Sequence, residues 1–271
     1  MEKITKFLIS IVKKSAKLIS NDLKISAKGE KGDLVTNFDV AIEKFLIENI
    51  SKRYPDFDII SEETSNDKKL SDNCFTIDPI DGTVNFANGL PMWSIQVACI
   101  KDNQTISAVI FFPKLKQLFY ADKSGAFCNG KKISVSHASI ENSIVATANS
   151  ISLPSFIPNL IESKICPHVR ATGCGSYNYA NLASGAIGAS IIMVKTPWDY
   201  VPGEFLVEQA GGVGFIKGNK RIFANTKETL EKLKKYKPLQ SGFFYFWDKI
   251  ISGTAISSLV KEQWWPLSLV L

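Results

Sequence analysis

The stretch that most constrains this chain runs from Phe75 to Phe86, where a short apolar run ends in two carboxylates and a Gly-Thr pair. The first three residues have the composition of a buried strand, and Asp78 and Asp81 follow directly. Pro79 has a fixed φ and no N–H, so we expect strand pairing to stop there. Both carboxylates would then face a cleft at the strand end.

Two carboxylates placed this close together require a cation. Oxygen ligands without a neighbouring His or Cys suit Mg²⁺ or Mn²⁺ better than Zn²⁺. Gly82 and Thr83 would open a helix whose free N–H groups bind a phosphate beside the metal. The alternative is structural, because Asp-Pro and Asp-Gly are common turn pairs, and Asp81-Gly82 alone would form a turn more often than a site.

Three further acids stand at the ends of expected elements. Glu62 follows an expected strand at residues 57–60. Asp39 precedes an amphipathic helix expected at residues 40–54, and Asp199 precedes one expected at residues 200–210. Asp39 and Asp199 can therefore be explained as helix N-caps, and an acidic residue at a strand end is usually solvated.

Several segments resemble the inositol monophosphatase family. The stretch from Asp78 to Thr83 resembles its first signature, and Trp198-Asp199 with the following Pro202-Gly203-Glu204 and Gly211-Gly212 resembles its second. An Asp-Leu-Val-Thr-x-x-Asp pattern that ends at Asp39 also fits, and the resemblance runs from about Lys28 to Asn225. It implies five ligands for two or three Mg²⁺ ions, with Mn²⁺ as a substitute: Glu62, Asp78, the carbonyl of Ile80, Asp81 and Asp199.

The resemblance also implies the remaining roles. Asp39 would pair with Thr83 to orient the attacking water, and Gly82 and Thr83 would hold the phosphate. The family has an Arg-x-x-Gly-(Ser/Thr)-Ala run where this chain has Arg170 to Gly175, so Gly173 and Cys174 would touch the substrate. The implied fold is α/β (α+β), a layered αβαβα sandwich with an antiparallel sheet in the first half and a mixed sheet in the second.

The expected activity is the Mg²⁺-dependent hydrolysis of a small-molecule phosphate monoester, inhibited by Li⁺. Relatives that act on inositol phosphates usually carry a Glu seven positions before the Asp that matches Asp199, and here that position is Ile192. The candidate substrates therefore include histidinol phosphate, fructose 1,6-bisphosphate and 3′-phosphoadenosine 5′-phosphate as well as inositol 1-phosphate. The resemblance favours a homodimer. A regulatory protein that uses the same fold to bind RNA or the transcription machinery is the alternative from another class.

Composition bounds the remaining possibilities. The 271 residues carry a formal net charge of +6, from scattered Lys without a basic stripe interleaved with aromatics, which disfavours nucleic acid as the main partner. Five cysteines without a Cys-x-x-Cys indicate reduced thiols and a cytoplasmic protein. We expect one domain at residues 1–237, with halves at 1–140 and 141–237. An apolar and aromatic extension of unknown role follows at 238–271, where charged residues disfavour membrane insertion.

Overall fold

The computed structural model describes residues 1–28, 34–64, 69–148, 165–166 and 168–235. Its helices are α1 (Lys3–Ser15), η1 (Ala16–Leu18), α2 (Asn37–Arg53), α3 (Thr83–Ala87), η2 (Ile140–Asn142), α5 (Gly175–Ala183), α6 (Pro197–Gln209) and α7 (Lys227–Lys235). Its strands are β1 (Ile25–Ala27), β2 (Leu34–Thr36), β3 (Asp58–Ser61), β4 (Cys74–Asp81), β5 (Ser94–Lys101), β6 (Gln104–Phe112), β7 (Gln117–Asp122), β8 (Gly125–Cys128), β9 (Lys131–Lys132), β10 (Ile144–Thr147), β11 (His168–Ala171), β12 (Ala189–Met193), β13 (Val213–Lys217) and β14 (Lys220–Ala224).

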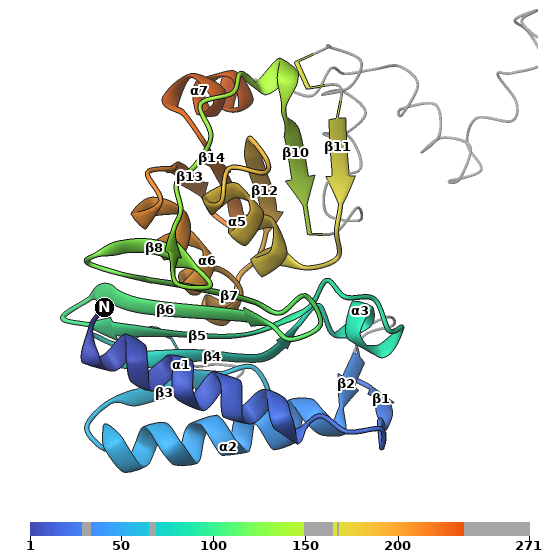
Figure 1. Ribbon diagram of the computed structural model, residues 1–271, viewed down its shortest axis with the longest axis vertical. Coiled ribbons are helices and arrows are strands. Elements are labelled where there is room, and N and C mark those ends of the chain that lie inside the picture. Colours follow the sequence, from blue (N-terminus) through green and yellow to red (C-terminus); the bar gives the residue numbers. More distant parts are fainter. Residues whose placement is uncertain (29–33, 65–68, 149–164, 167, 236–271) are drawn as a thin grey trace, which may run out of the picture.

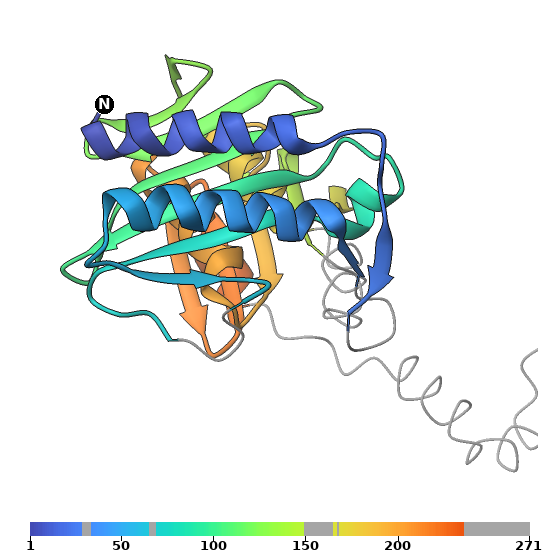
Figure 2. The same ribbon diagram turned by 90° about the horizontal axis from the view of Figure 1, so that it is seen from below.

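These elements stack in layers (Figure 1). Helices α1 and α2 lie side by side across one face of a seven-stranded sheet, as Figure 2 shows from below. Helices α5 and α6 lie between that sheet and a five-stranded sheet, whose far side is covered by α7. The expected αβαβα sandwich is confirmed.

Three apolar clusters fill the spaces between the layers. One joins α1 and α2 to the large sheet and includes Leu8, Ile42 and Phe75. The largest joins the large sheet to α5, α6 and the small sheet, and a third lies under α7. Strand β4 is buried from Cys74 to Ile80, and only its last residue, Asp81, is partly exposed. A strand fixed in this way gives its last residues a rigid base.

The large sheet has the order β3-β4-β5-β6-β7-β8-β9. All its pairs are antiparallel except β3 and β4, which run parallel, so the expectation of an antiparallel first sheet was wrong for its edge strand. The parallel register sets Ser61 opposite Ile77 and brings the residues that follow β3 beside the end of β4. The small sheet, with the order β11-β10-β12-β14-β13, is mixed as expected.

Two local expectations were wrong at the start of α2 and the end of β4. Thr36, not Asp39, is the N-cap of α2, and Asp39 completes a capping box from the first turn. Strand β4 does not stop at Pro79 but reaches Asp81, with a register shift between Asp78 and Asp81 against β5. A β-bulge tolerates Pro, because the extra residue makes no ladder bond. The bulge also redirects the side chains beyond it.

Part of the expected organisation lies outside the described residues. The extension at 238–271 is among these, as is part of the expected Asp-Leu-Val-Thr-x-x-Asp pattern, which begins at Asp33. Within the described part of the chain, no helix is long and apolar enough to cross a membrane.

Candidate active site

The first pair of acids lies at the end of β4. Asp78 is 1% exposed, and its Oδ2 accepts a hydrogen bond of 3.0 Å from Nε2 of Gln96 on β5. Its Oδ1 is buried and has no hydrogen-bond partner. A buried carboxylate oxygen without a partner is costly, because it has lost water and gained nothing in return. This oxygen is therefore available to bind a cation or to accept a hydrogen bond.

Asp81 lies beyond the bulge and is held by the second half of the chain. Its Oδ2 accepts from the backbone N–H of Ser176, at 2.6 Å, and from the thiol of Cys174, at 3.1 Å. Ser176 belongs to the first turn of α5, whose unpaired N–H groups favour a negative charge. The start of α5 thus holds the Asp81 carboxylate in place.

Glu62 is brought to the same place by the parallel pairing of β3 with β4. Its backbone N–H donates to the carbonyl of Ile77 at 3.3 Å. Its carboxylate lies 3.3 Å from Nζ of Lys28, and Lys28 also contacts Glu63 at 2.7 Å. Glu62 is therefore partly neutralised by a side chain of the protein itself.

Asp199 lies in the first turn of α6 and accepts a hydrogen bond from the Thr196 hydroxyl. Thr196 occupies the N-cap position of α6, so the interpretation of Asp199 as the cap residue was wrong. A β-carbon built on Gly175 would lie 3.8 Å from the Asp199 carbonyl and 4.0 Å from Oδ2 of Asp81. The first turns of α5 and α6 therefore converge on the end of β4.

The electrostatics show that the four carboxyl groups share one neighbourhood. Burial, followed by the charges of Glu62, Asp81 and Asp199, raises the pKa of Asp78 well above its ordinary value. Burial also raises the pKa of Glu62 to about 8, against the opposing effect of Lys28 and with a contribution from Asp199. Such mutual repulsion is relieved by a cation or by protons. Among the described residues, however, no three His, Cys, Asp or Glu side chains are already arranged as a closed metal-binding group.

Asp39 and Thr83 do not form the expected pair in this structure. The Thr83 hydroxyl donates to the carbonyl of Ile80 at 2.8 Å, and Oδ2 of Asp39 accepts from the backbone N–H of Thr36 at 2.7 Å and from its hydroxyl. The other oxygen of Asp39, Oδ1, is buried without a partner. Burial raises the pKa of Asp39 to about 6, although the hydrogen bonds from Thr36 oppose the shift.

Gly82 and the loop that carries Gly173 meet at the start of α3. Gly82 is the N-cap of α3 and has a φ of +84°, a conformation that favours glycine. A β-carbon on it would lie 3.0 Å from the Met92 carbonyl and 3.1 Å from Cβ of Cys174. Gly173 is exposed, but Cys174 is only 1% exposed and its thiol contacts Asp81. The Cys174 side chain is therefore buried against Asp81.

Comparison with known proteins identifies the family of this chain. The sequence model of the inositol monophosphatase family matches residues 1–240. The chain belongs to the inositol monophosphatase family. The family resemblance expected from the two signatures is thereby confirmed, and membership supports phosphatase activity.

Three similar proteins illustrate the range of the family. A Thermotoga maritima protein named fructose-1,6-bisphosphatase/inositol-1-monophosphatase is 34% identical over 185 residues, covering 67% of this chain and 70% of its own. The Nus factor SuhB of Haemophilus influenzae is 34% identical over 224 residues, covering 76% and 83%. The solved structure of a Thermotoga maritima IMPase has a TM-score of 0.77 at 28% identity, covering 86% of this chain and 96% of its own.

Several residues of the chain support the site, although no sequence pattern predicts this role for them. Gln96 supports Asp78 from the neighbouring strand, and Ser176 supports Asp81 from a position 95 residues away. Asn85 lies within the stretch from Phe75 to Phe86 and could have been noticed there. Its partners, however, are backbone carbonyls that no spacing rule identifies.

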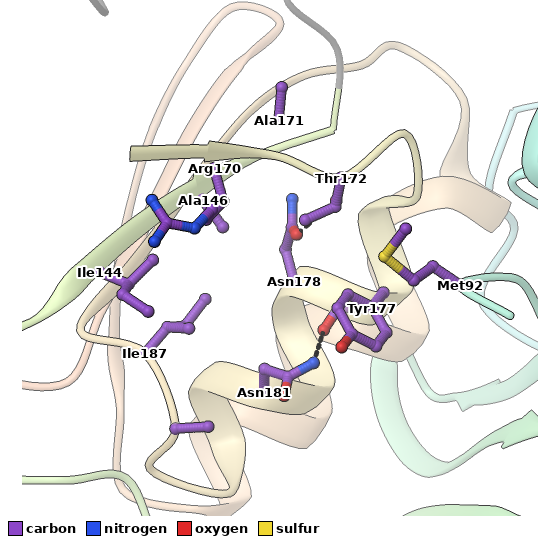
Figure 3. A pocket seen from close by; sticks show the side chains of 11 residues that line it. Met92, Ile144, Ala146, Arg170, Ala171, Thr172, Tyr177, Asn178, Asn181 and Ile187 are labelled. Carbon is purple, nitrogen blue, oxygen red and sulfur yellow. Dashed lines mark hydrogen bonds between the residues drawn. The ribbon is translucent and has the colours of Figure 1, made fainter. Parts of the chain in front are cut away.

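A cavity of about 450 Å³ lies beside the loop that precedes α5 (Figure 3). Met92, Arg170, Thr172 and Asn178 are among its lining residues. The Thr172 hydroxyl donates to Oδ1 of Asn178 at 2.7 Å. The side chain of Thr172 therefore faces this cavity on one side of the loop.

Proposed function

We propose that this chain hydrolyses a small-molecule phosphate monoester with the help of Mg²⁺. The observation that carries the proposal is Oδ1 of Asp78, a buried and unpartnered carboxylate oxygen whose charge is opposed by Glu62, Asp81 and Asp199. Burying mutually repelling carboxylates is unfavourable unless a bound cation offsets their repulsion. The arrangement is therefore the one expected of a cation-binding site.

The donor set fits Mg²⁺ or Mn²⁺. The proposed ligands are all oxygens, namely the carboxylates of Glu62, Asp78, Asp81 and Asp199 and the carbonyl of Ile80. Cys174 is close, but burial and the nearby Asp81 charge raise its thiol pKa well above the ordinary value, so the protonated thiol acts as a donor to Asp81. Hard cations prefer such oxygen ligands. We propose two or three ions, which when bound supply a more acidic water and a counter-charge for the leaving oxygen.

The chain's own residues would position the reaction. We assign Asp39 and Thr83 to the attacking water, since Oδ1 of Asp39 is a buried acceptor without a partner. For that role the Thr83 hydroxyl has to turn away from the Ile80 carbonyl, which then becomes available as a ligand. The N–H groups of Gly82 and Thr83 would hold the phosphate oxygens at the start of α3. Lys28 would release Glu62 when a cation binds.

The substrate proposal rests on the second half of the chain. Gly173 is exposed beside the carboxylates, so its backbone and that of Cys174 would contact the part of the ester beyond the phosphate. Ile192 is 2% exposed and apolar, and its Cδ1 would lie 3.5 Å from a β-carbon on Gly175. An aliphatic side chain cannot bind a ring hydroxyl, which argues against inositol as the preferred group.

The direct test is a screen of the purified protein against inositol 1-phosphate, histidinol phosphate, fructose 1,6-bisphosphate and 3′-phosphoadenosine 5′-phosphate, with Mg²⁺ and with EDTA. We expect Mg²⁺-dependent phosphate release from at least one ester. Release that is unchanged by EDTA would contradict the metal proposal. The absence of release from every ester would contradict the enzymatic proposal as a whole.

A second candidate function is regulatory. It is favoured by the relative named Nus factor SuhB. In this case the protein would contact RNA or the transcription machinery through its surface, independently of the carboxylates. Salt-dependent RNA binding that survives Asp81→Asn would support this role, because phosphate contacts weaken as salt rises.

We also propose a cytoplasmic location and a homodimer. All five cysteines are free thiols, four of them buried, which suits a reducing compartment. Sedimentation of the purified protein over a range of concentrations measures the oligomeric state. A monomer throughout that range would contradict the dimer.

A further inference from the structure

Asn85 joins two segments that belong to different halves of the chain. It lies on α3 and is only 7% exposed. Its Nδ2 donates to the carbonyl of Met92 at 2.8 Å and to the carbonyl of Thr172 at 2.9 Å. Thr172 is 87 residues away along the chain. One side-chain amide thus uses both of its protons to connect α3 to the loop that precedes α5.

The backbone of Gly173 packs closely against this amide. A β-carbon on Gly173 would lie 2.9 Å from Oδ1 and 3.1 Å from Nδ2 of Asn85, and Gly173 has a φ of +73°. On the neighbouring side, a β-carbon on Gly82 would meet the Met92 carbonyl at 3.0 Å. Two glycines therefore allow the loop, the amide and the start of α3 to approach closely.

The loop from Thr172 to Cys174 has a different environment on each side. The Thr172 carbonyl faces Asn85, whereas its hydroxyl bonds to Asn178 at the wall of the cavity in Figure 3. The loop continues into α5, which holds Asp81 through the N–H of Ser176. The Asn85 amide thus adds a direct hydrogen bond from α3 to this loop, beside the contact of the Cys174 thiol with Asp81.

We infer that Asn85 is a positioning residue, which fixes the Thr172–Cys174 loop against α3 so that the loop binds the part of the substrate beyond the phosphate. This inference rests on the proposed function for its kinetic consequence but not for its structural one. Asn85 itself does not contact the reacting atoms. Its loss should weaken the binding of the whole ester and leave the binding of inorganic phosphate nearly unchanged.

The test compares Asn85→Ala and Asn85→Asp with Asn88→Ala. Asn88 is a matched control, because it is on the same short segment and its Nδ2 donates at 2.8 Å to Val84 O within α3, without reaching the second half. Asp has the shape of Asn but no amide protons, so it removes both hydrogen bonds at nearly constant volume and adds a negative charge beside the two carbonyls. It also gives a second variant if the alanine protein fails to fold.

Two readouts are needed. Hydrogen exchange of the amides from Thr172 to Ser176 should be at least about tenfold faster in both Asn85 variants and unchanged in Asn88→Ala. With the ester that the wild type hydrolyses best, KM should rise at least about tenfold while kcat changes by less than about threefold. In Asn85→Ala, the inhibition constant of inorganic phosphate should stay within about twofold of the wild-type value.

The outcomes separate this inference from the proposed function. Exchange at wild-type rates in both Asn85 variants would overturn the inference, as would a fall in kcat with KM unchanged. Equal weakening of the ester and of inorganic phosphate would also overturn it. If the wild type hydrolyses no ester, the proposed function fails, and the exchange measurement alone then decides whether Asn85 fixes the loop.

Discussion

Glu62→Gln should stabilise the metal-free protein at high pH. Burial raises the pKa of Glu62 from its ordinary value of 4.5 to about 8. The pKa of Glu62 is higher in the folded than in the unfolded protein, so the ionised side chain lowers the free energy of unfolding. This destabilisation is absent well below pH 4.5, grows as the pH rises, and reaches its full value above about pH 8. The full rise corresponds to about 5 kcal/mol. At pH 6.5 the same linkage gives roughly half of that cost.

The opposing contribution in the variant is smaller. Glutamine removes the contact between Lys28 and Glu62, at 3.3 Å, but Lys28 keeps its shorter contact with Glu63. An ion pair of this kind contributes about 1 kcal/mol or less. The effect of Lys28 is already contained in the pKa of about 8, so the free energy of unfolding of the variant should exceed that of the wild type by at most about 5 kcal/mol at pH 9. The difference should nearly vanish at pH 5.

Urea unfolding in EDTA at pH 5, 7 and 9 measures this difference. Glu63→Gln is the matched control, because Glu63 contacts the same Lys28 but raises the pKa of Glu62 only as a lesser contributor. Adding Mg²⁺ should stabilise the wild type more than Glu62→Gln, since a ligand that binds only the folded state adds about 2.7 kcal/mol at one hundred times its Kd. If Glu62→Gln is no more stable than Glu63→Gln at pH 9, the reasoning about the carboxylate cluster is refuted.

Three further predictions concern catalysis. Asp81→Ala should abolish turnover while the protein stays folded, and near-normal phosphate release would refute the assignment. The variant leaves the N–H of Ser176 without its partner, which should lower the free energy of unfolding by about 1–3 kcal/mol. Thr83→Ala should lower kcat in steady-state assays with little change in KM, and a change confined to KM would assign Thr83 to binding instead. Millimolar Li⁺ should inhibit phosphate release in the presence of Mg²⁺ by occupying a Mg²⁺ position, and full activity in Li⁺ would contradict this.

Much of the fold follows from local sequence. The Asn129-Gly130 pair, for example, predicts a hairpin tip, and both residues have positive φ in the structure. The paired acids at the end of β4 were also visible, because carboxylates seldom lie beside a buried strand unless they are paired or bind a cation. The predicted end of β4 at Pro79 was wrong, since a bulge let the strand continue to Asp81.

The supporting contacts of the site could not be predicted. Asp81 depends on Ser176, and Asn85 on Thr172, across separations that only the packing of the two halves determines. The N-cap role of Thr36 could have been predicted from local sequence, because Thr is a strong capping residue. Asp39, however, was a competing candidate for the same role. Local sequence therefore identified Asp78 and Asp81, and the family resemblance added Glu62 and Asp199. Tertiary structure determined how each carboxylate is held.

The central claim is that Glu62, Asp78, Asp81 and Asp199 together bind divalent cations at the end of β4. Crystals soaked in Mn²⁺ and inorganic phosphate, with anomalous diffraction measured at the Mn²⁺ edge, test it most directly. The account predicts at least two anomalous peaks within about 2–2.3 Å of these carboxylate oxygens, one of them next to Oδ1 of Asp78. Peaks only elsewhere on the protein, or none at a Mn²⁺ concentration that saturates phosphate release, would contradict it.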